Sequence, residues 1–153
     1  FIIWTLYRLK IGRSVYDLFC NSLVINMSFV FVCIDNDAAR AMIIKELQQN
    51  NVPLIDVGMG VQTVDNFLIG SLRVTLVTPE KRDHIDRRIP MGNNEDNEYA
   101  TNIQIADLNA LNANIAVIEW KKYSGFYHAI KRFHNFTYST NDSNFVADEI
   151  FDT

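Results

Sequence analysis

Cysteine, proline and glycine are all scarce in this chain of 153 residues, which has two, three and six of them respectively. Two cysteines are too few for a disulfide framework or for a zinc site built from four thiolates. No apolar run is long enough to span a membrane, because Asn26, Ser28 and Asp35 interrupt the longest one. A formal net charge of −4, with scattered basic residues, gives no footprint for nucleic acid or an anionic membrane. These absences favour a cytoplasmic protein with neither nucleic acid nor membrane as a partner.

The composition that remains is that of a globular protein with a substantial core. Hydrophobic residues make up 48% of the chain and charged residues 21%, so we expect a single domain over residues 1–153. The chain starts at Phe1, its first methionine is Met27, and residues 1–9 are apolar enough to pack against other protein. We therefore expect it to be part of a longer protein.

A strand, a helix and a second strand are predicted between residues 27 and 57. Residues 27–34 are rich in Val and Phe and apolar on both faces, which is typical of a buried strand in a parallel sheet. Asn36 can cap a helix over residues 37–50, and residues 52–57 predict the next buried strand, closed by a turn at Gly58-Met59-Gly60. The apolar residues that fall at helical spacing are Ala39, Met42, Ile43 and Leu47. This order predicts an α/β fold.

Antiparallel structure is predicted after Gly60. Residues 67–78 alternate as a half-exposed strand does, and residues 79–99 are charged enough to predict a long exposed loop. A long amphipathic helix over residues 100–122, ended by Ser124-Gly125, and a hairpin over residues 133–138 and 144–147 complete the chain. The helix is expected to bury Ile103, Leu108, Leu111, Ile115 and Ile118, with an asparagine stripe at Asn102, Asn109 and Asn112 beside them.

Asp35 is the leading candidate for a functional residue, because ligands of open α/β sheets bind beyond the carboxyl ends of the parallel strands. One interpretation is that Asp35 caps the following helix, with Asn36 or Asp37 sharing that role. The other is that it holds Mg²⁺ or contacts a ribose phosphate, since one or two carboxylates and phosphates are the usual magnesium ligands. Position alone leaves both open. Cys33 is expected to be a buried apolar residue and His84 to be solvated.

Several segments share a family pattern in the same order. CIDNDAAR (residues 33–40) has an Asp-Asn pair followed by Ala-Arg, with Arg40 five positions after Asp35. VPLIDVGMG (52–60), GSLRVTLVTP (70–79) and NEYATNIQIADLNALNANIAVIEWKKYSGFY (97–127) follow. Together they resemble the superfamily of ThiF, MoeB and ubiquitin-activating enzymes, over residues 28–128.

This resemblance implies the carboxyl-terminal half of a Rossmann-like, ThiF-type adenylation domain. Such a domain uses ATP and Mg²⁺ to adenylate the C-terminal carboxylate of a ubiquitin-like or sulfur-carrier protein. The resemblance also implies a homodimer, and it makes residues 79–99 the crossover loop. On that basis Asp35 and Arg40 are catalytic, Asp35 binds the metal, and the residues that contact ATP are Asp35, Asn36, Gly58 and Gly60. Arg40 has an alternative role as an ion-pair partner that orients the helix.

The departures from the family pattern limit this expectation. The sequence has no G-x-G-x-x-G phosphate-binding turn, and Gly58-Met59-Gly60 is a different turn. No cysteine follows Cys33, so a thioester step needs a thiol from elsewhere. This chain alone is not expected to turn over ATP. The rival interpretations are a non-catalytic ThiF-like partner that binds a ubiquitin-like tail, and a piece of a Rossmann-type oxidoreductase.

Overall fold

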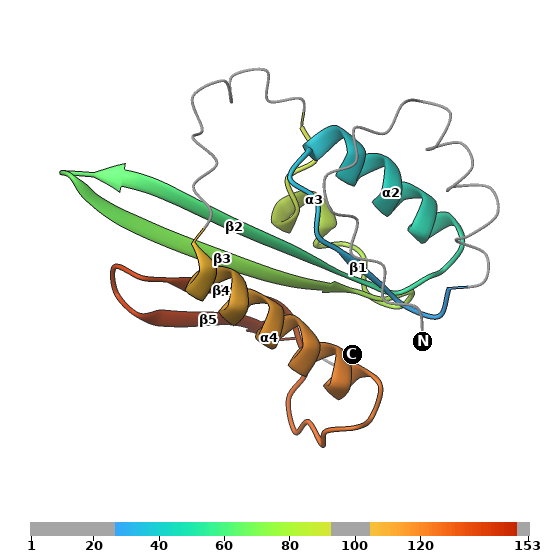
Figure 1. The fold of residues 1–153 in the computed structure, drawn as a ribbon. Helices are drawn as coiled ribbons and strands as arrows, with labels where there is room; N and C mark the ends of the chain where they lie inside the picture. The colour runs from blue at the N-terminus through green and yellow to red at the C-terminus, as the bar shows by residue number, and fades with distance from the viewer. Residues whose placement is uncertain (1–26, 93–104, 150–153) are drawn as a thin grey trace. The chain divides into compact units, whose positions relative to one another are not determined.

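The structure, a computed structural model, describes residues 27–92 and 105–149 (Figure 1). Its five strands form one mixed sheet in the order β1-β2-β3-β4-β5. β1 and β2 pair in parallel, whereas β3 with β4 and β4 with β5 pair antiparallel, so the predicted α/β fold is confirmed. The elements are β1 (Val30–Val32), α2 (Asp37–Gln49), β2 (Leu54–Val64), β3 (Phe67–Val77), α3 (Ile85–Arg88), α4 (Ala106–Tyr123), β4 (Phe133–Ser139) and β5 (Asn144–Glu149).

The chain divides into two compact units, and strands β2 and β3 each run from one unit into the other. Among the described residues, the first unit comprises residues 27–56 and 77–92. The second unit comprises residues 57–76 and 105–149.

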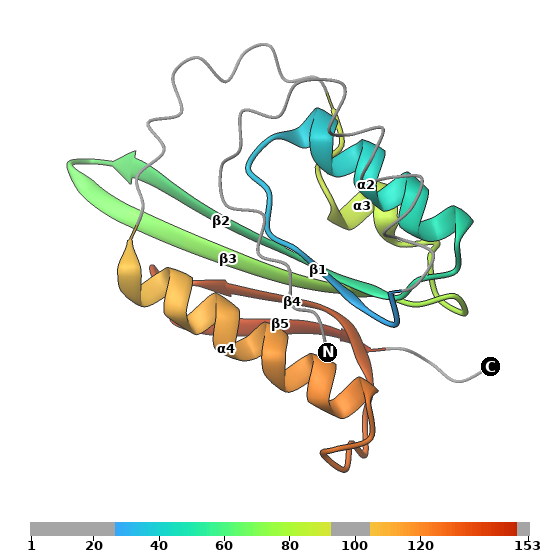
Figure 2. The same cartoon turned by 45° about the vertical axis from the view of Figure 1, so that its right-hand side comes forward.

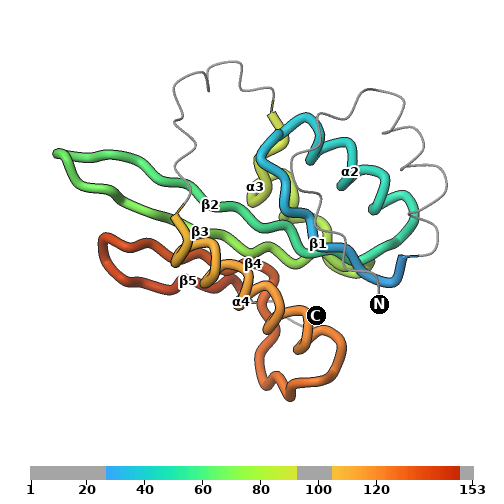
Figure 3. Tube along the Cα trace, viewed as in Figure 1, coloured from blue at the N-terminus to red at the C-terminus, as the bar shows by residue number. Residues whose placement is uncertain are grey.

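The core of the first unit forms where α2 packs on the parallel pair β1 and β2 (Figure 3). Ile43, Ile44 and Leu47 of α2 are buried together with Val32 and Leu54 of the two strands. Burying each side chain of this size stabilises the fold by about 1.5–3 kcal/mol. Met42, predicted to belong to this face, is instead 54% exposed, and Ile44 points inward.

Both ends of α2 are fixed by local hydrogen bonds. The side chain of Asn36 accepts a hydrogen bond from the Ala39 amide at 2.8 Å, which confirms the predicted N-cap. At the other end Asn51 adopts a left-handed conformation with φ of 54°, and the Val52 amide donates to the Leu47 carbonyl at 2.9 Å. This is a Schellman ending, in which asparagine takes the place usually held by glycine.

β2 continues through the two glycines, so the predicted turn at Gly58-Met59-Gly60 is wrong. The chain reverses later, at Asp65-Asn66, where both residues have positive φ angles of 49° and 65°. Two left-handed residues form the type I′ turn whose twist matches a β-hairpin, and Asp and Asn tolerate that conformation better than most residues. β2 and β3 are therefore long strands that form a hairpin, rather than ending at the glycines.

Residues 79–92 are not the exposed loop that their charge predicts. They include the single turn α3, and His84, Ile85 and Ile89 have exposed fractions of 0%, 3% and 2%. The two isoleucines belong to the core of the first unit. The prediction of a solvated His84 is therefore wrong. The many charged residues of this segment suggest a solvated loop, although a few of its positions face inward.

In the second unit, α4 lies along one face of the antiparallel strands (Figure 2). Its buried residues are Leu108, Asn112, Ala116 and Glu119. The predicted apolar face is correct only at Leu108, since Ile118 is 41% exposed and Leu111 and Ile115 are half-buried. A Cβ added at Gly70 of β3 would lie 2.3 Å from Leu108 Cδ1, so glycine permits this close approach of helix and strand.

The end of α4 and the closing hairpin follow the predictions. Gly125 has φ of 77°, and the Phe126 amide donates to the Lys121 carbonyl at 2.8 Å in a Schellman ending. β4 and β5 form the hairpin. The predictions for residues 1–26 and 93–104, including Ile103 and Asn102, lie outside the described residues. No helix in the described ranges is both long enough and apolar enough to cross a membrane.

Candidate functional site

The candidate site is the junction between β1 and α2 in the first unit. β1 ends at Val32, and residues 33–36 lead into the helix. Asp35 is exposed, and the adjacent Asn36 provides the helix cap. The interpretation of Asp35 as the cap is therefore not needed, and its carboxylate lies just outside the helix, beyond the carboxyl end of a parallel strand. That position is the one expected for a ligand-binding residue in this class of sheet.

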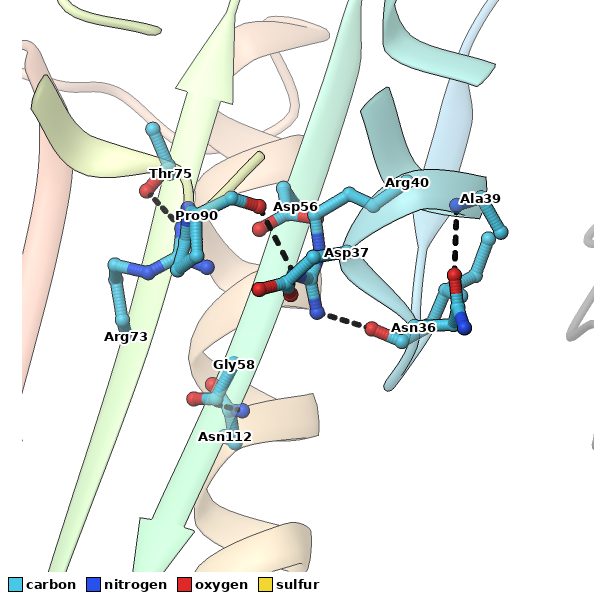
Figure 4. Close-up of polar contacts among 11 residues, drawn as sticks. Asn36, Asp37, Ala39, Arg40, Asp56, Gly58, Arg73, Thr75, Pro90 and Asn112 are labelled. Atoms are coloured by element: carbon cyan, nitrogen blue, oxygen red, sulfur yellow. Dashed lines mark hydrogen bonds and ion pairs between the residues drawn. The ribbon is translucent and has the colours of Figure 1, made fainter. Parts of the chain in front are cut away.

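Arg40, the second predicted catalytic residue, lies at the centre of a buried ionic cluster (Figure 4). Arg40 is 6% exposed, and its side chain forms ion pairs with Asp37 and Asp56, the latter with 3.2 Å between Nε and Oδ1. The guanidinium also donates to the backbone carbonyls of Ile34 and Pro90, the latter at 3.1 Å. These contacts favour the alternative role of Arg40, an ion-pair partner that orients the start of α2. We name Arg40, Asp37 and Asp56 the ionic cluster.

Asp56 is the residue of this site that sequence reasoning missed. It lies in β2 opposite Val32 of β1, and its exposed fraction is 0%. The available signal was a single carboxylate inside the apolar run of residues 52–57, because a buried charge requires a partner of opposite charge. Arg40, in the helix that precedes this strand, is that partner.

Cys33 departs from the prediction in part, because the residue as a whole is exposed although its sulfur is partly enclosed by packing. Packing around the sulfur raises the pKa of the Cys33 thiol, and the carboxylate of Asp56 raises it further. A raised pKa keeps the thiol protonated and weakly nucleophilic at neutral pH. The geometry thus gives no support to Cys33 as a thioester-forming nucleophile.

The two glycines predicted to contact ATP lie in the second unit, inside β2. A Cβ added at Gly58 would lie 2.9 Å from Nη2 of Arg73, so the absence of a side chain makes room for that guanidinium. A Cβ at Gly60 would lie 3.6 Å from the hydroxyl oxygen of Ser71, an ordinary contact. Gly58 therefore has a packing role, and neither glycine forms a phosphate-binding turn.

The second unit contains a polar row across three strands. Arg73 donates to the Thr75 hydroxyl at 2.7 Å, and this hydroxyl donates to the amide oxygen of Asn135 at 2.8 Å. The Asn135 amide nitrogen in turn donates to Asp148 at 3.3 Å. Thr75 and Asn135 are 0% and 2% exposed. We name these four residues the polar row.

Asn112 of α4 has a structural role. Its side-chain amide donates to the Gly58 carbonyl at 3.1 Å, so it joins the helix to the backbone of β2. Asn109, on the same predicted stripe, is exposed. The described part of the stripe does not form one surface.

The comparisons with known proteins bear on the fold. No family model matches this chain, and no curated protein matches it. Among solved structures, the chain is similar to a selenomethionine crystal structure of PaaA, with a TM-score of 0.53 and 13% sequence identity. The match covers 92% of this chain but only 46% of that chain, so this chain spans less than half of the solved protein's length. At this identity the likeness shows the fold alone.

Proposed function

We propose that this chain is the carboxyl-terminal half of a ThiF-like domain that adenylates the C-terminal carboxylate of a ubiquitin-like or sulfur-carrier protein, using ATP and Mg²⁺. The observation that carries the proposal is the exposed carboxylate of Asp35, between the end of a parallel strand and a capped helix. Ligands bind at this place in open α/β sheets. The segment around Asp35 is also the one that resembles the family motif.

A magnesium ion fits this residue as one ligand among several. The described residues contain no group of three or more His, Cys, Asp or Glu side chains that could hold a metal. In nucleotide sites, however, Mg²⁺ is held by one or two carboxylates while phosphates and water complete its octahedron. Asp35 can supply that carboxylate, and a bound ion would neutralise charge that develops on the phosphoryl oxygens.

The chain's own residues would orient the reacting groups rather than transfer protons. Asn36 caps α2 and so leaves the Asp35 carboxylate outside the helix. Arg40 holds the backbone that carries Asp35 and is too buried to serve as an open phosphate contact. The phosphate cradle, the thiol acceptor and the homodimer partner would belong to the complete protein.

A non-catalytic ThiF-like partner that binds a ubiquitin-like tail is the second candidate. Gly58 and Gly60 lie within a strand, and the sequence has no Gly-rich phosphate turn. An inactive partner would need neither a glycine turn at residues 58–60 nor a Gly-rich phosphate turn. The two candidates differ in what they predict for Asp35, since only the enzyme requires its charge.

The test is the substitution Asp35→Asn in the complete protein, measured as ATP–pyrophosphate exchange with the carrier protein. We expect exchange to fall at least about a hundredfold, which corresponds to roughly 2.7 kcal/mol of lost transition-state stabilisation. Thermal stability should change little, because Asp35 is exposed and Asn36 provides the cap. The control Asp86→Asn removes another exposed carboxylate of the same unit and should leave exchange intact. Near-normal exchange in Asp35→Asn would favour the inactive partner.

A further inference from the structure

The ionic cluster places a full negative charge where packing alone would favour an apolar residue. Asp56 follows Leu54 and Ile55 in β2, and all three are 0% exposed. Replacing a buried ion pair with well-packed apolar residues is often neutral or stabilising. Stability alone therefore does not require an ion pair at this position, so what Asp56 does through its partner is of interest.

That partner, Arg40, is held so that its donors diverge to several places. Nε faces Asp56 at 3.2 Å, Nη2 donates to the Ile34 carbonyl, and Nη1 is shared between Asp37 and the Pro90 carbonyl. A guanidinium is planar, so contacts at Nε and at the two terminal nitrogens together fix its orientation. Asp56 faces Nε as an ion-pair partner, without a hydrogen bond between Nε and Oδ1, and so contributes to where Arg40 points alongside the hydrogen bonds of the terminal nitrogens.

The most direct consequence falls on the peptide bond between Ile34 and Asp35. The carbonyl that accepts from Arg40 belongs to this peptide, so the hydrogen bond orients the peptide plane whose nitrogen is that of Asp35. This backbone lies outside the strand β1 and before the helix cap Asn36, where neither regular element fixes it. The ionic cluster thus connects Asp56 of the buried strand β2 to the backbone carbonyl that precedes Asp35.

We propose that Asp56 is a positioning residue that acts through Arg40 to hold the Ile34–Asp35 peptide, and with it the Asp35 carboxylate, in the orientation that binds a magnesium–nucleotide complex. This inference rests on the proposed function, because it gives Asp35 the metal. It adds a residue that touches neither metal nor nucleotide. Partners that orient a metal ligand in this way typically change metal affinity by about 10–100-fold when they are removed.

The experiment measures ATP affinity of the complete protein by calorimetry, once with Mg²⁺ and once with EDTA, in the wild type and the variants Asp35→Asn, Asp56→Asn and Arg40→Lys. The quantity compared is the gain in affinity that Mg²⁺ provides. We expect Asp56→Asn to lose about 10–100-fold of this gain while its affinity in EDTA stays at the wild-type value. Arg40→Lys keeps the charge beside Asp56 but lacks the planar fork, so we expect it to fold and to lose the gain as well.

Arg82→Gln is the matched control. Arg82 is another arginine of the first unit that donates to backbone carbonyls, those of Pro79 and Gln48, but it ties residue 82 to the carboxyl end of α2 rather than to Asp35. Its substitution should leave the Mg²⁺-dependent gain unchanged.

The possible outcomes separate this inference from the proposed function. If Asp35→Asn loses the gain while Asp56→Asn and Arg40→Lys keep it, the positioning role is wrong and the function stands. An equal loss of affinity with Mg²⁺ and with EDTA in Asp56→Asn would also overturn the inference, because it would indicate general damage to the fold. A wild-type protein whose ATP affinity does not depend on Mg²⁺ would overturn both.

Discussion

The two units bury polar side chains in different ways. In the first unit, one arginine gathers two carboxylates and two backbone carbonyls at a single point beside the end of β1. In the second unit, the central members of the polar row are the neutral groups Thr75 and Asn135, which lie directly opposite each other on β3 and β4. The row continues to Asp148, the partner of Asn135 on β5.

The difference indicates what each arrangement can control. A guanidinium with several partners in divergent directions fixes a backbone segment in space, which suits a junction that must present a ligand. A row of hydrogen bonds between paired strands fixes their register, since a slip by one residue would turn every side chain to the opposite face. The first arrangement therefore fixes the backbone of a strand-to-helix junction, and the second fixes the register of a sheet.

The largest effect should come from breaking the ionic cluster on one side. Asp56→Ala leaves Arg40 buried with one carboxylate fewer, and removing one member of a buried ion pair costs about 3–5 kcal/mol. Urea unfolding monitored by circular dichroism would measure this loss. The double substitution Arg40→Met and Asp56→Leu should recover most of it, because it removes both charges.

The control for this prediction is Asp83→Ala. Asp83 is exposed and pairs with Lys81 at 2.8 Å, and the hydrogen bond from Lys81 lowers the pKa of its carboxyl. Its removal should leave the unfolding midpoint in place, since exposed ion pairs contribute little. A similar loss in both aspartate variants would contradict the special role of the buried charge.

A smaller effect is expected when the polar row is interrupted. Thr75→Val keeps the shape of the side chain but removes the hydroxyl that donates to Asn135, and a buried acceptor that loses its donor costs about 1–3 kcal/mol. Chemical denaturation would measure the change. Thr137→Val on β4 is the control, because Thr137 is only half-buried and its substitution should change stability by less than about 0.5 kcal/mol. Equal costs for the two threonines would show that the row adds nothing to the sheet.

A third substitution tests the contribution of the helix cap to stability separately from that of the ionic cluster. Asn36→Ala removes the acceptor for the Ala39 amide and should cost about 1 kcal/mol, less than the loss of Asp56. Asn36→Asp restores an acceptor and should recover the stability, as thermal melting would show. A loss in Asn36→Asp as large as that in Asn36→Ala would mean that Asn36 acts by something other than capping.

The features that sequence predicted well are those set by neighbours along the chain. The cap at Asn36 and the ending of α4 at Gly125 each depend on hydrogen bonds within a few residues. Such contacts leave a local signature, because only a few residue types satisfy helix ends or tolerate positive φ angles. The junction that carries Asp35 was found for the same reason.

The features that sequence missed depend on contacts between distant segments. The counter-charge of Asp56 comes from Arg40 on another element, and Gly58 leaves room for the Arg73 side chain of the next strand. Asn112 is buried in place of an apolar residue because it reaches the carbonyl of Gly58. Glycine predicts a turn and a charged residue predicts exposure only until the segment that packs against them is known.

The smallest expected effect is a change in the pKa of the Cys33 thiol, which reports the charge of Asp56 in the ionic cluster. Burial and the Asp56 carboxylate both raise the pKa of the Cys33 thiol, in that order of size. Asp56→Asn removes the negative charge that opposes formation of the thiolate, so the pKa of Cys33 should fall towards its ordinary value without reaching it, because the effect of burial remains.

The measurement is the pH dependence of alkylation by iodoacetamide in a Cys20→Ser background, since Cys20 is the other cysteine of the chain. Asp83→Asn, which removes an exposed carboxylate of the same unit, should leave the alkylation profile unchanged. An unchanged or higher pKa of Cys33 in Asp56→Asn would mean that the Asp56 carboxylate does not act on this thiol, and that the ionic cluster does not extend its influence to the end of β1.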